Sequence, residues 1–334
     1  MDTLYTLQVI WYFIIGILFI GYSLLDGFDL GIAALSPFLA KDDTDRKTLF
    51  GIIWPFWDGN EVWLVTGGAA LFAAFPYAYA TVFSGFYLAL MLVLFALIFR
   101  AVSIEFWHYD EKRRSLWNTA FVVGSVIPAL LFGVALGNVI VGIPLNGATD
   151  FTGNFFTLLR PYPLIIGLLG LAAVLMQGST YAALKSDGAL RDRARIAAKM
   201  VWYIYVIIFT IAVIATIAFI PAATERFVFW ILVLLVTLSL AFNWINITKI
   251  KKDLFSFILS SLSFIGLWGI AGAIHFPNLV QANNDPALSL TLSNASSSEL
   301  TLKVMLGIAA IGMPVVVLYT AFVYRVLRRK VSYN

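Results

Sequence analysis

Cysteine is absent from this chain of 334 residues, and charged residues make up only 12% of it. The lack of cysteine excludes disulfides, Fe–S clusters and metal or haem sites that use a thiolate ligand. A soluble protein carries about 25% charged residues, so this chain has little charge to spread over a water-facing surface. Histidine is also scarce, since it occurs only as His108 and His275.

Apolar residues fill the chain instead and reach 61%, whereas a soluble domain has about 45–50%. Nine apolar runs are long enough to cross a bilayer. We therefore predict an all-α polytopic membrane protein, with residues 1–334 forming a single transmembrane domain. The expected spans cover about 7–36, 49–75, 78–105, 117–142, 158–183, 199–220, 226–247, 254–275 and 302–326.

The lysines and arginines predict the orientation of these spans. They cluster after the odd-numbered spans, while the opposite side carries Arg160, Arg226 and Lys303, and Arg100 falls within a span. The N-terminus is therefore predicted outside and the C-terminus in the cytoplasm, as an odd number of spans requires. The net charge of +4 does not indicate nucleic-acid binding, because the basic residues lie in short loops between spans.

Two carboxylates, Asp58 and Glu61, stand three residues apart inside the second span, so a helix places them on one face. A charged side chain near the bilayer centre costs roughly 2.5–3.5 kcal/mol on insertion scales. Such a residue persists when it is paired, buried in protein or neutral. The pair favours a proton path or a polar substrate site; a structural role in hydrogen bonding between helices is the alternative.

Further charged residues fall at matching depths in the first three spans. Asp29, Asp58 and Arg100 lie roughly 10–14 Å from the cytoplasmic ends of their helices, and Asp26 and Glu61 lie about one turn deeper. We expect one polar cluster that opens toward the cytoplasm. Arg100 either pairs with Asp29 or Asp58 or extends its side chain to the cytoplasmic headgroups.

The two histidines are predicted on opposite sides of the membrane. His108 follows span 78–105 on the cytoplasmic side, and His275 ends span 254–275 on the outer side. They cannot share a haem, because bis-histidine ligation needs both rings at one depth. We expect no metal site and no haem bound by this chain alone, although a single His or Met ligand stays open.

Several long motifs carry a family resemblance. Residues 21–31 (GYSLLDGFDLG), 57–63 (WDGNEVW) and 67–76 (GGAALFAAFP) resemble the first- and second-span signatures of subunit II of bacterial cytochrome bd quinol oxidases. Residues 152–156 (TGNFF), the loop 294–302 and residues 318–321 (LYTA) fit the same family. The resemblance covers nearly the whole chain.

The resemblance implies a haem-free subunit of a terminal oxidase in the bacterial cytoplasmic membrane. The family enzyme oxidises a membrane quinol and reduces oxygen to water, with haems b and d and the quinol site in subunit I. Subunit II is expected to form two four-helix groups plus one additional helix and to pack against subunit I as a pseudo-symmetric heterodimer. A bound quinone and a small single-helix subunit occur in some members, and both stay open here.

The resemblance also assigns roles to residues. Asp58 is expected to contribute to a proton route from the cytoplasm, with Glu61, Asp29, Asp26 and Arg100 nearby. Trp63, with Trp57, is expected to line an oxygen path or the subunit seam, and ordinary packing between helices is the alternative. A proton-coupled permease and a purely structural scaffold are the competing functions.

Overall fold

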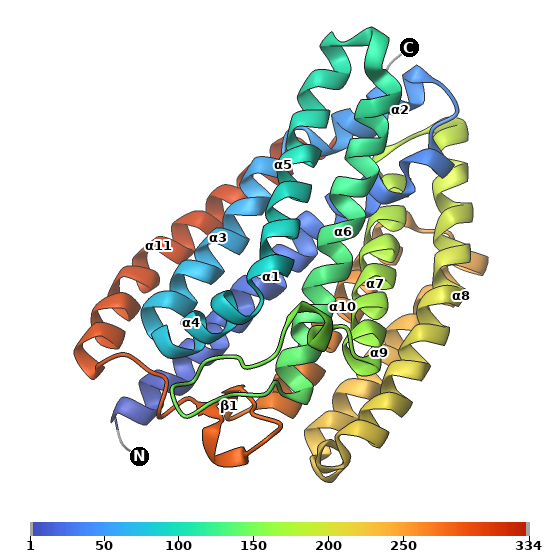
Figure 1. The fold of residues 1–334 in the computed structure, drawn as a ribbon. Coiled ribbons are helices and arrows are strands. Elements are labelled where there is room, and N and C mark those ends of the chain that lie inside the picture. Colours follow the sequence, from blue (N-terminus) through green and yellow to red (C-terminus); the bar gives the residue numbers. More distant parts are fainter. Residues whose placement is uncertain (1–2, 332–334) are drawn as a thin grey trace.

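The computed structural model describes residues 3–331, so residues 1–2 and 332–334 of the expected single domain lie outside the described part. The chain folds into a bundle of long helices that run up and down beside one another (Figure 1). In chain order the helices are α1 (Thr3–Leu39), α2 (Asp43–Ile53), α3 (Trp57–Ala74), α4 (Pro76–Gly85), α5 (Tyr87–Tyr109), α6 (Arg114–Val141), α7 (Pro161–Lys185), α8 (Gly188–Phe219), α9 (Phe227–Ile245), α10 (Asp253–His275) and α11 (Glu299–Val326).

The two ends of the bundle differ in charge. One end carries α2, the turn between α5 and α6, and residues 327–331, and we call it the basic end. Ion pairs join its segments, including Arg114 Nη1 to Asp43 Oδ2 at 2.5 Å and Arg193 to Asp45. The N-terminal end of α1 and the strand β1 (Asn278–Val280) lie at the opposite end (Figure 1).

Eight helices in residues 3–331 are long and apolar enough to cross a membrane: α1 and α5 to α11. Helix α3 is not among these eight, and its first turns carry Asp58, Asn60 and Glu61. The chain is therefore an all-α, multi-pass membrane protein. The ninth crossing and the orientation stay predictions.

Two expected spans are wrong as continuous helices. The segment 49–75 divides into α2, which ends at Ile53, and α3, which begins at Trp57. Pro55 lies between them and has no N–H to continue the helical hydrogen bonds. The segment 78–105 divides at Phe86, between α4 and α5.

Helix α7 lies at the centre of the bundle and packs against α1, α6, α8 and α10. The closest approach joins Gly31 of α1 to Gly178 of α7. A Cβ atom on Gly31 would lie 2.1 Å from the carbonyl oxygen of Val174 and 2.8 Å from Gly178 Cα. The absence of side chains at this crossing therefore lets the two backbones touch.

Helix α11 lies at the edge of the bundle beside α1 and α3 (Figure 1). Within Glu299–Val326, Leu302 alone is buried. The segment before α11 forms an antiparallel pair of strands, β1 (Asn278–Val280) and β2 (Leu290–Thr291). It is tied to the helices, for example by Gln8 Nε2, which donates to Ser296 Oγ at 2.6 Å.

Candidate functional site

The site is built around Arg100 of α5, whose side chain is only 1% exposed. Helix α6 approaches closely at this level because Gly124 faces α5. A Cβ atom on Gly124 would lie 2.6 Å from the carbonyl oxygen of Ala96 and 3.1 Å from Arg100 Cβ. Glycine at this position thus brings α6 directly against the arginine and closes it off from lipid.

Arg100 forms two ion pairs with carboxylates of neighbouring helices. Its Nη1 donates to Asp26 Oδ1 of α1 at 2.8 Å, and its Nη2 donates to Glu61 Oε1 of α3 at 2.5 Å. Asp26 is fully buried, and the Glu61 side chain is 26% exposed. Both expectations for Arg100 are therefore wrong, since the guanidinium neither reaches the headgroups nor pairs with Asp29 or Asp58.

The direction of helical side chains explains this difference. Long side chains on an α-helix point back toward its N-terminus. The N-terminal end of α5 lies away from the basic end, so the Arg100 side chain points deeper into the bundle than its Cα atom. It therefore meets Asp26 and Glu61, which were expected about one turn deeper.

Asp29 joins the site through Asn60 rather than through Arg100. Asn60 Nδ2 donates to Asp29 Oδ2 at 2.8 Å and to the carbonyl oxygen of Leu25 at 3.0 Å. The hydroxyl of Tyr324 in α11 donates to Asn60 Oδ1 at 3.0 Å. Asn60 and Tyr324 were both missed from the sequence, although Asn60 lies within the WDGNEVW motif between the two carboxylates.

The cluster holds more carboxyl groups than cations. Asp26 and Glu61 both pair with Arg100, whereas Asp29 accepts a hydrogen bond from the neutral amide of Asn60. Within residues 3–331, Asp26 Oδ2, Asp29 Oδ1 and the Tyr22 hydroxyl are buried without a hydrogen-bond partner. A proton bound to one of the carboxyl groups would lower the net negative charge of the cluster.

Asp58 stands apart from this cluster. Its side chain lies on the exposed side of α3, whereas Asn60 and Gly67 are buried. It is also the second residue of α3 and thus lies in the first turn of that helix. The expected depth of Asp58 assumed one helix that began near Leu49, and the division into α2 and α3 removes that basis, so its depth stays a prediction.

Trp57 and Trp63 are both half-buried on α3. Trp57 packs against the large apolar core between α1, α7 and α10. The Trp63 ring packs against α1, since a Cβ atom added to Gly21 would be 2.2 Å from Trp63 Cε3. This contact favours packing between α1 and α3 as one role of Trp63.

The two histidines cannot both ligate one haem, because they lie at opposite ends of the bundle. His108 lies in the last turn of α5 and His275 ends α10. A hollow of about 540 Å³ at the end of α11 is lined by arginine and apolar residues, and a narrower one near Asn138 is also without histidine or methionine. Residues 3–331 contain no cluster of three or more His, Cys, Asp or Glu side chains able to hold a metal ion.

Comparisons with known proteins agree with the motifs. The family model of cytochrome bd terminal oxidase subunit II matches residues 7–327. The chain is 33% identical to cytochrome bd-I ubiquinol oxidase subunit 2 of Escherichia coli (strain K12), over 95% of this chain and 93% of that protein. It is 31% identical to cytochrome bd ubiquinol oxidase subunit 2 of Bacillus subtilis (strain 168), over 98% of each.

A solved structure shares the fold. The bd oxidase from Geobacillus thermodenitrificans contains a chain that superposes with a TM-score of 0.80 at 16% identity, over 96% of this chain and 98% of that one. The fold, the motifs and the family model all agree, and the chain belongs to the subunit II family of cytochrome bd terminal oxidases.

Proposed function

We propose that this chain is the haem-free subunit of a quinol:oxygen oxidoreductase and supplies part of its proton route from the cytoplasm. Family membership supports an oxidase subunit over the proton-coupled permease. The relatives' description as ubiquinol oxidases supports a membrane quinol as the electron donor. The haem-bearing partner would be subunit I, in the bacterial cytoplasmic membrane.

The observation that carries the proposal is the buried ionisable cluster of α1, α3 and α5. Oxidation of two quinols supplies four electrons, and reduction of one oxygen molecule to two waters consumes these together with four protons. Protons taken from the cytoplasm must cross apolar protein. Only ionisable groups, polar groups or water can carry protons through such a region. Asp26, Asp29, Glu61 and Arg100 form such a polar region within the bundle.

In this proposal, Asp58 passes protons between this polar region and the partner subunit. It faces outward from α3, and a carboxylate that faced lipid would be costly. A protein partner that covers this side of α3 removes that cost. Glu61 follows one helical turn later on α3, is itself partly exposed, and connects Asp58 to the Arg100 cluster.

Trp57 and Trp63 are assigned to the same seam, where an oxygen path is the second role for Trp63. Replacement of Trp63 by leucine should then change the apparent oxygen affinity at unchanged haem content. If that affinity stays constant, packing against Gly21 is the whole role of Trp63. A bound quinone and a small accessory subunit are not needed for any part of this proposal.

The replacement Asp58→Asn tests the proton role. Asparagine keeps the shape and hydrogen bonding of the side chain but cannot carry a proton. We expect the two-subunit complex to assemble with normal haem content, while quinol-driven oxygen consumption falls at least about tenfold. Asp192→Asn is the matched control, because Asp192 is also exposed and predicted near the cytoplasm, but it lies on α8.

Two outcomes would contradict the assignment. Loss of haem together with activity would make Asp58 a structural residue of the seam. Near-normal turnover in Asp58→Asn would mean that protons pass by another route.

A further inference from the structure

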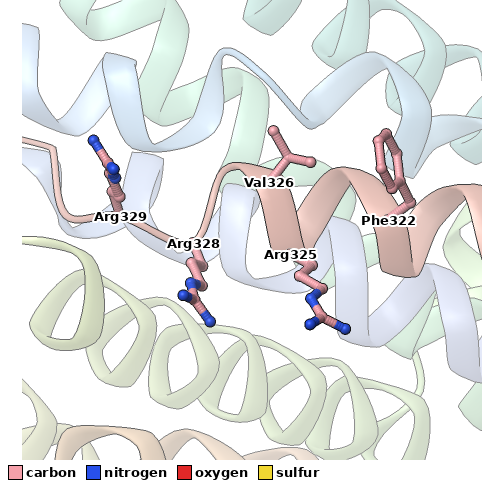
Figure 2. A pocket seen from close by; sticks show the side chains of 5 residues that line it. All are labelled: Phe322, Arg325, Val326, Arg328 and Arg329. Atoms are coloured by element: carbon pink, nitrogen blue, oxygen red, sulfur yellow. The ribbon is translucent and has the colours of Figure 1, made fainter.

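The end of α11 forms a hollow lined by three arginines. Arg325, Arg328 and Arg329 surround it together with Phe322 and Val326, and it has a volume of about 540 Å³. Arg325 and Arg328 point to the same side of the helix end (Figure 2). All three arginines are exposed, and they lie at the basic end of the bundle.

Within residues 3–331 these three arginines have no carboxylate partner, unlike four other arginines at the basic end. Arg191 and Arg195 both pair with Asp253, at 2.5 and 2.8 Å, and Arg114 and Arg193 are paired with aspartates as described above. Among the described residues, no ion pair involves the side chains that line the α11 hollow. The hollow therefore presents uncompensated positive charge.

The segment that carries the arginines is held in place. Lys185 Nζ, at the end of α7, donates to the carbonyl oxygen of Leu327 at 2.6 Å. The N–H of Val331 donates to the carbonyl oxygen of Lys185 at 2.9 Å, and Lys330 Nζ pairs with Asp187 Oδ1 at 2.5 Å. The arginines thus stand on an anchored turn, so less conformational freedom is lost when they bind an anion.

An apolar surface leads away from the hollow along α11. Val315, Leu318 and Phe322 are each more than 60% exposed on this helix. The charged hollow therefore adjoins a strip that matches the hydrocarbon region of the bilayer. A ligand that fits both parts has an anionic head and long apolar chains.

We propose that the arginine hollow at the end of α11 binds the phosphate headgroup of an anionic phospholipid, with its acyl chains along α11. Arginine binds phosphate oxygens through paired N–H donors. Basic clusters at the cytoplasmic end of membrane helices select anionic over zwitterionic lipids. The excess of basic residues that is usual in cytoplasmic loops depends on their charge alone. This site has two further features: its arginines stand on an anchored turn without ion pairs among the described residues, and an apolar wall adjoins them.

Native mass spectrometry of the purified two-subunit complex tests the proposal, with phosphatidylglycerol and phosphatidylcholine as the two probes. The parent complex should retain phosphatidylglycerol and release phosphatidylcholine. The double variant Arg325→Gln/Arg328→Gln should weaken phosphatidylglycerol retention by about 25-fold, since each arginine near an anionic headgroup contributes roughly a factor of five. Arg325→Lys/Arg328→Lys should retain much of the binding.

The control is Lys112→Gln/Arg113→Gln, which removes two exposed cations from the turn after α5 and should leave retention unchanged. Equal loss in the control would mean that total charge, not this hollow, holds the lipid. Unchanged retention in Arg325→Gln/Arg328→Gln would overturn the proposal. Displacement of the lipid by inorganic phosphate would assign the hollow to a free anion, and loss of the haem-bearing subunit would assign it to the subunit interface.

Discussion

At the scale of single residues, the buried guanidinium of Arg100 links three helices. Arg100 of α5 bonds to Asp26 of α1 and Glu61 of α3, and each pair lies largely out of water. A buried pair adds little net stability, but removal of one partner leaves an uncompensated charge. Arg100 therefore has two separable roles, one in holding the helices together and one in setting the charge of the proposed proton route.

Arg100→Met should separate these roles. The single replacement leaves Asp26 and Glu61 without their cation and should destabilise the complex by about 3–5 kcal/mol. The triple replacement Arg100→Met/Asp26→Leu/Glu61→Met removes all three charges and should recover much of this loss. Differential scanning fluorimetry of the purified complex measures the stability, and an oxygen electrode measures turnover.

The two measurements should diverge in the triple variant. Its unfolding temperature should approach that of the parent, while quinol-driven oxygen consumption stays low because the ionisable groups are gone. Recovery of both would show that the cluster is structural only. A single variant as stable as the parent would contradict the ion pairs themselves.

The sequence correctly placed Asp26, Glu61 and Arg100 near one another, because depth along consecutive spans is enough to predict this. The nearness of Asp26, Glu61 and Arg100 follows from three consecutive spans with charges at similar depth. Side-chain direction was not included in that estimate, so the partners of Arg100 were assigned one turn too shallow. Tyr324 was missed because α11 follows Asn60 by more than two hundred residues, and nothing in the sequence brings that helix beside α3.

At the scale of elements, the crossing of α1 and α7 depends on two glycines. The backbones meet at Gly31 and Gly178, so no side chain can be accommodated without separating the helices. Asp29 lies two residues before this crossing, and Asp26 lies on the same helix. Packing at Gly31 therefore sets the position of the carboxylates relative to the centre of the bundle.

Gly31→Ala should reduce the yield and the unfolding temperature of the complex. The added methyl group would lie 2.1 Å from the Val174 carbonyl oxygen, and overpacking of this kind costs about 1–3 kcal/mol or more. Gly16→Ala on the same helix is the control, because no atom lies within 4 Å of its added Cβ. If both variants lose stability to the same extent, the close crossing is not the cause.

The boundaries of α6, α10 and α11 were predicted to within about three residues, but α8 begins at Gly188, eleven residues before its expected start, because its first turns are charged and precede the apolar run. The break at Pro55 was missed because the apolar run continues through it, and hydropathy does not register the loss of one backbone donor. The same limitation affected the estimate of depth for Asp58.

At the scale of the whole molecule, the crossing of α3 decides the topology. Between Lys47 in α2 and Asn284 in the loop between β1 and β2, the long helices are α3 and α5 to α10. If α3 crosses the membrane, the number of crossings between these two residues is odd. If it does not, the number is even.

Reporter fusions at Lys47 and Asn284 test this count directly. Green fluorescent protein should fluoresce at Lys47, and alkaline phosphatase should be active at Asn284, because the basic residues predict Lys47 inside. Fusion of each reporter at both positions provides the control. Detection of both positions on the same side would remove α3 from the spans and overturn the ninth crossing.

The ion pairs of Arg100 have a consequence for how the chain is made. Synthesis proceeds from the N-terminus, so α1 and α3 leave the ribosome before α5 does. An isolated arginine near the middle of a span is costly to insert. Asp26 and Glu61 are synthesised before Arg100. The order of the helices in the chain therefore makes both ion-pair partners available when α5 is inserted into the membrane.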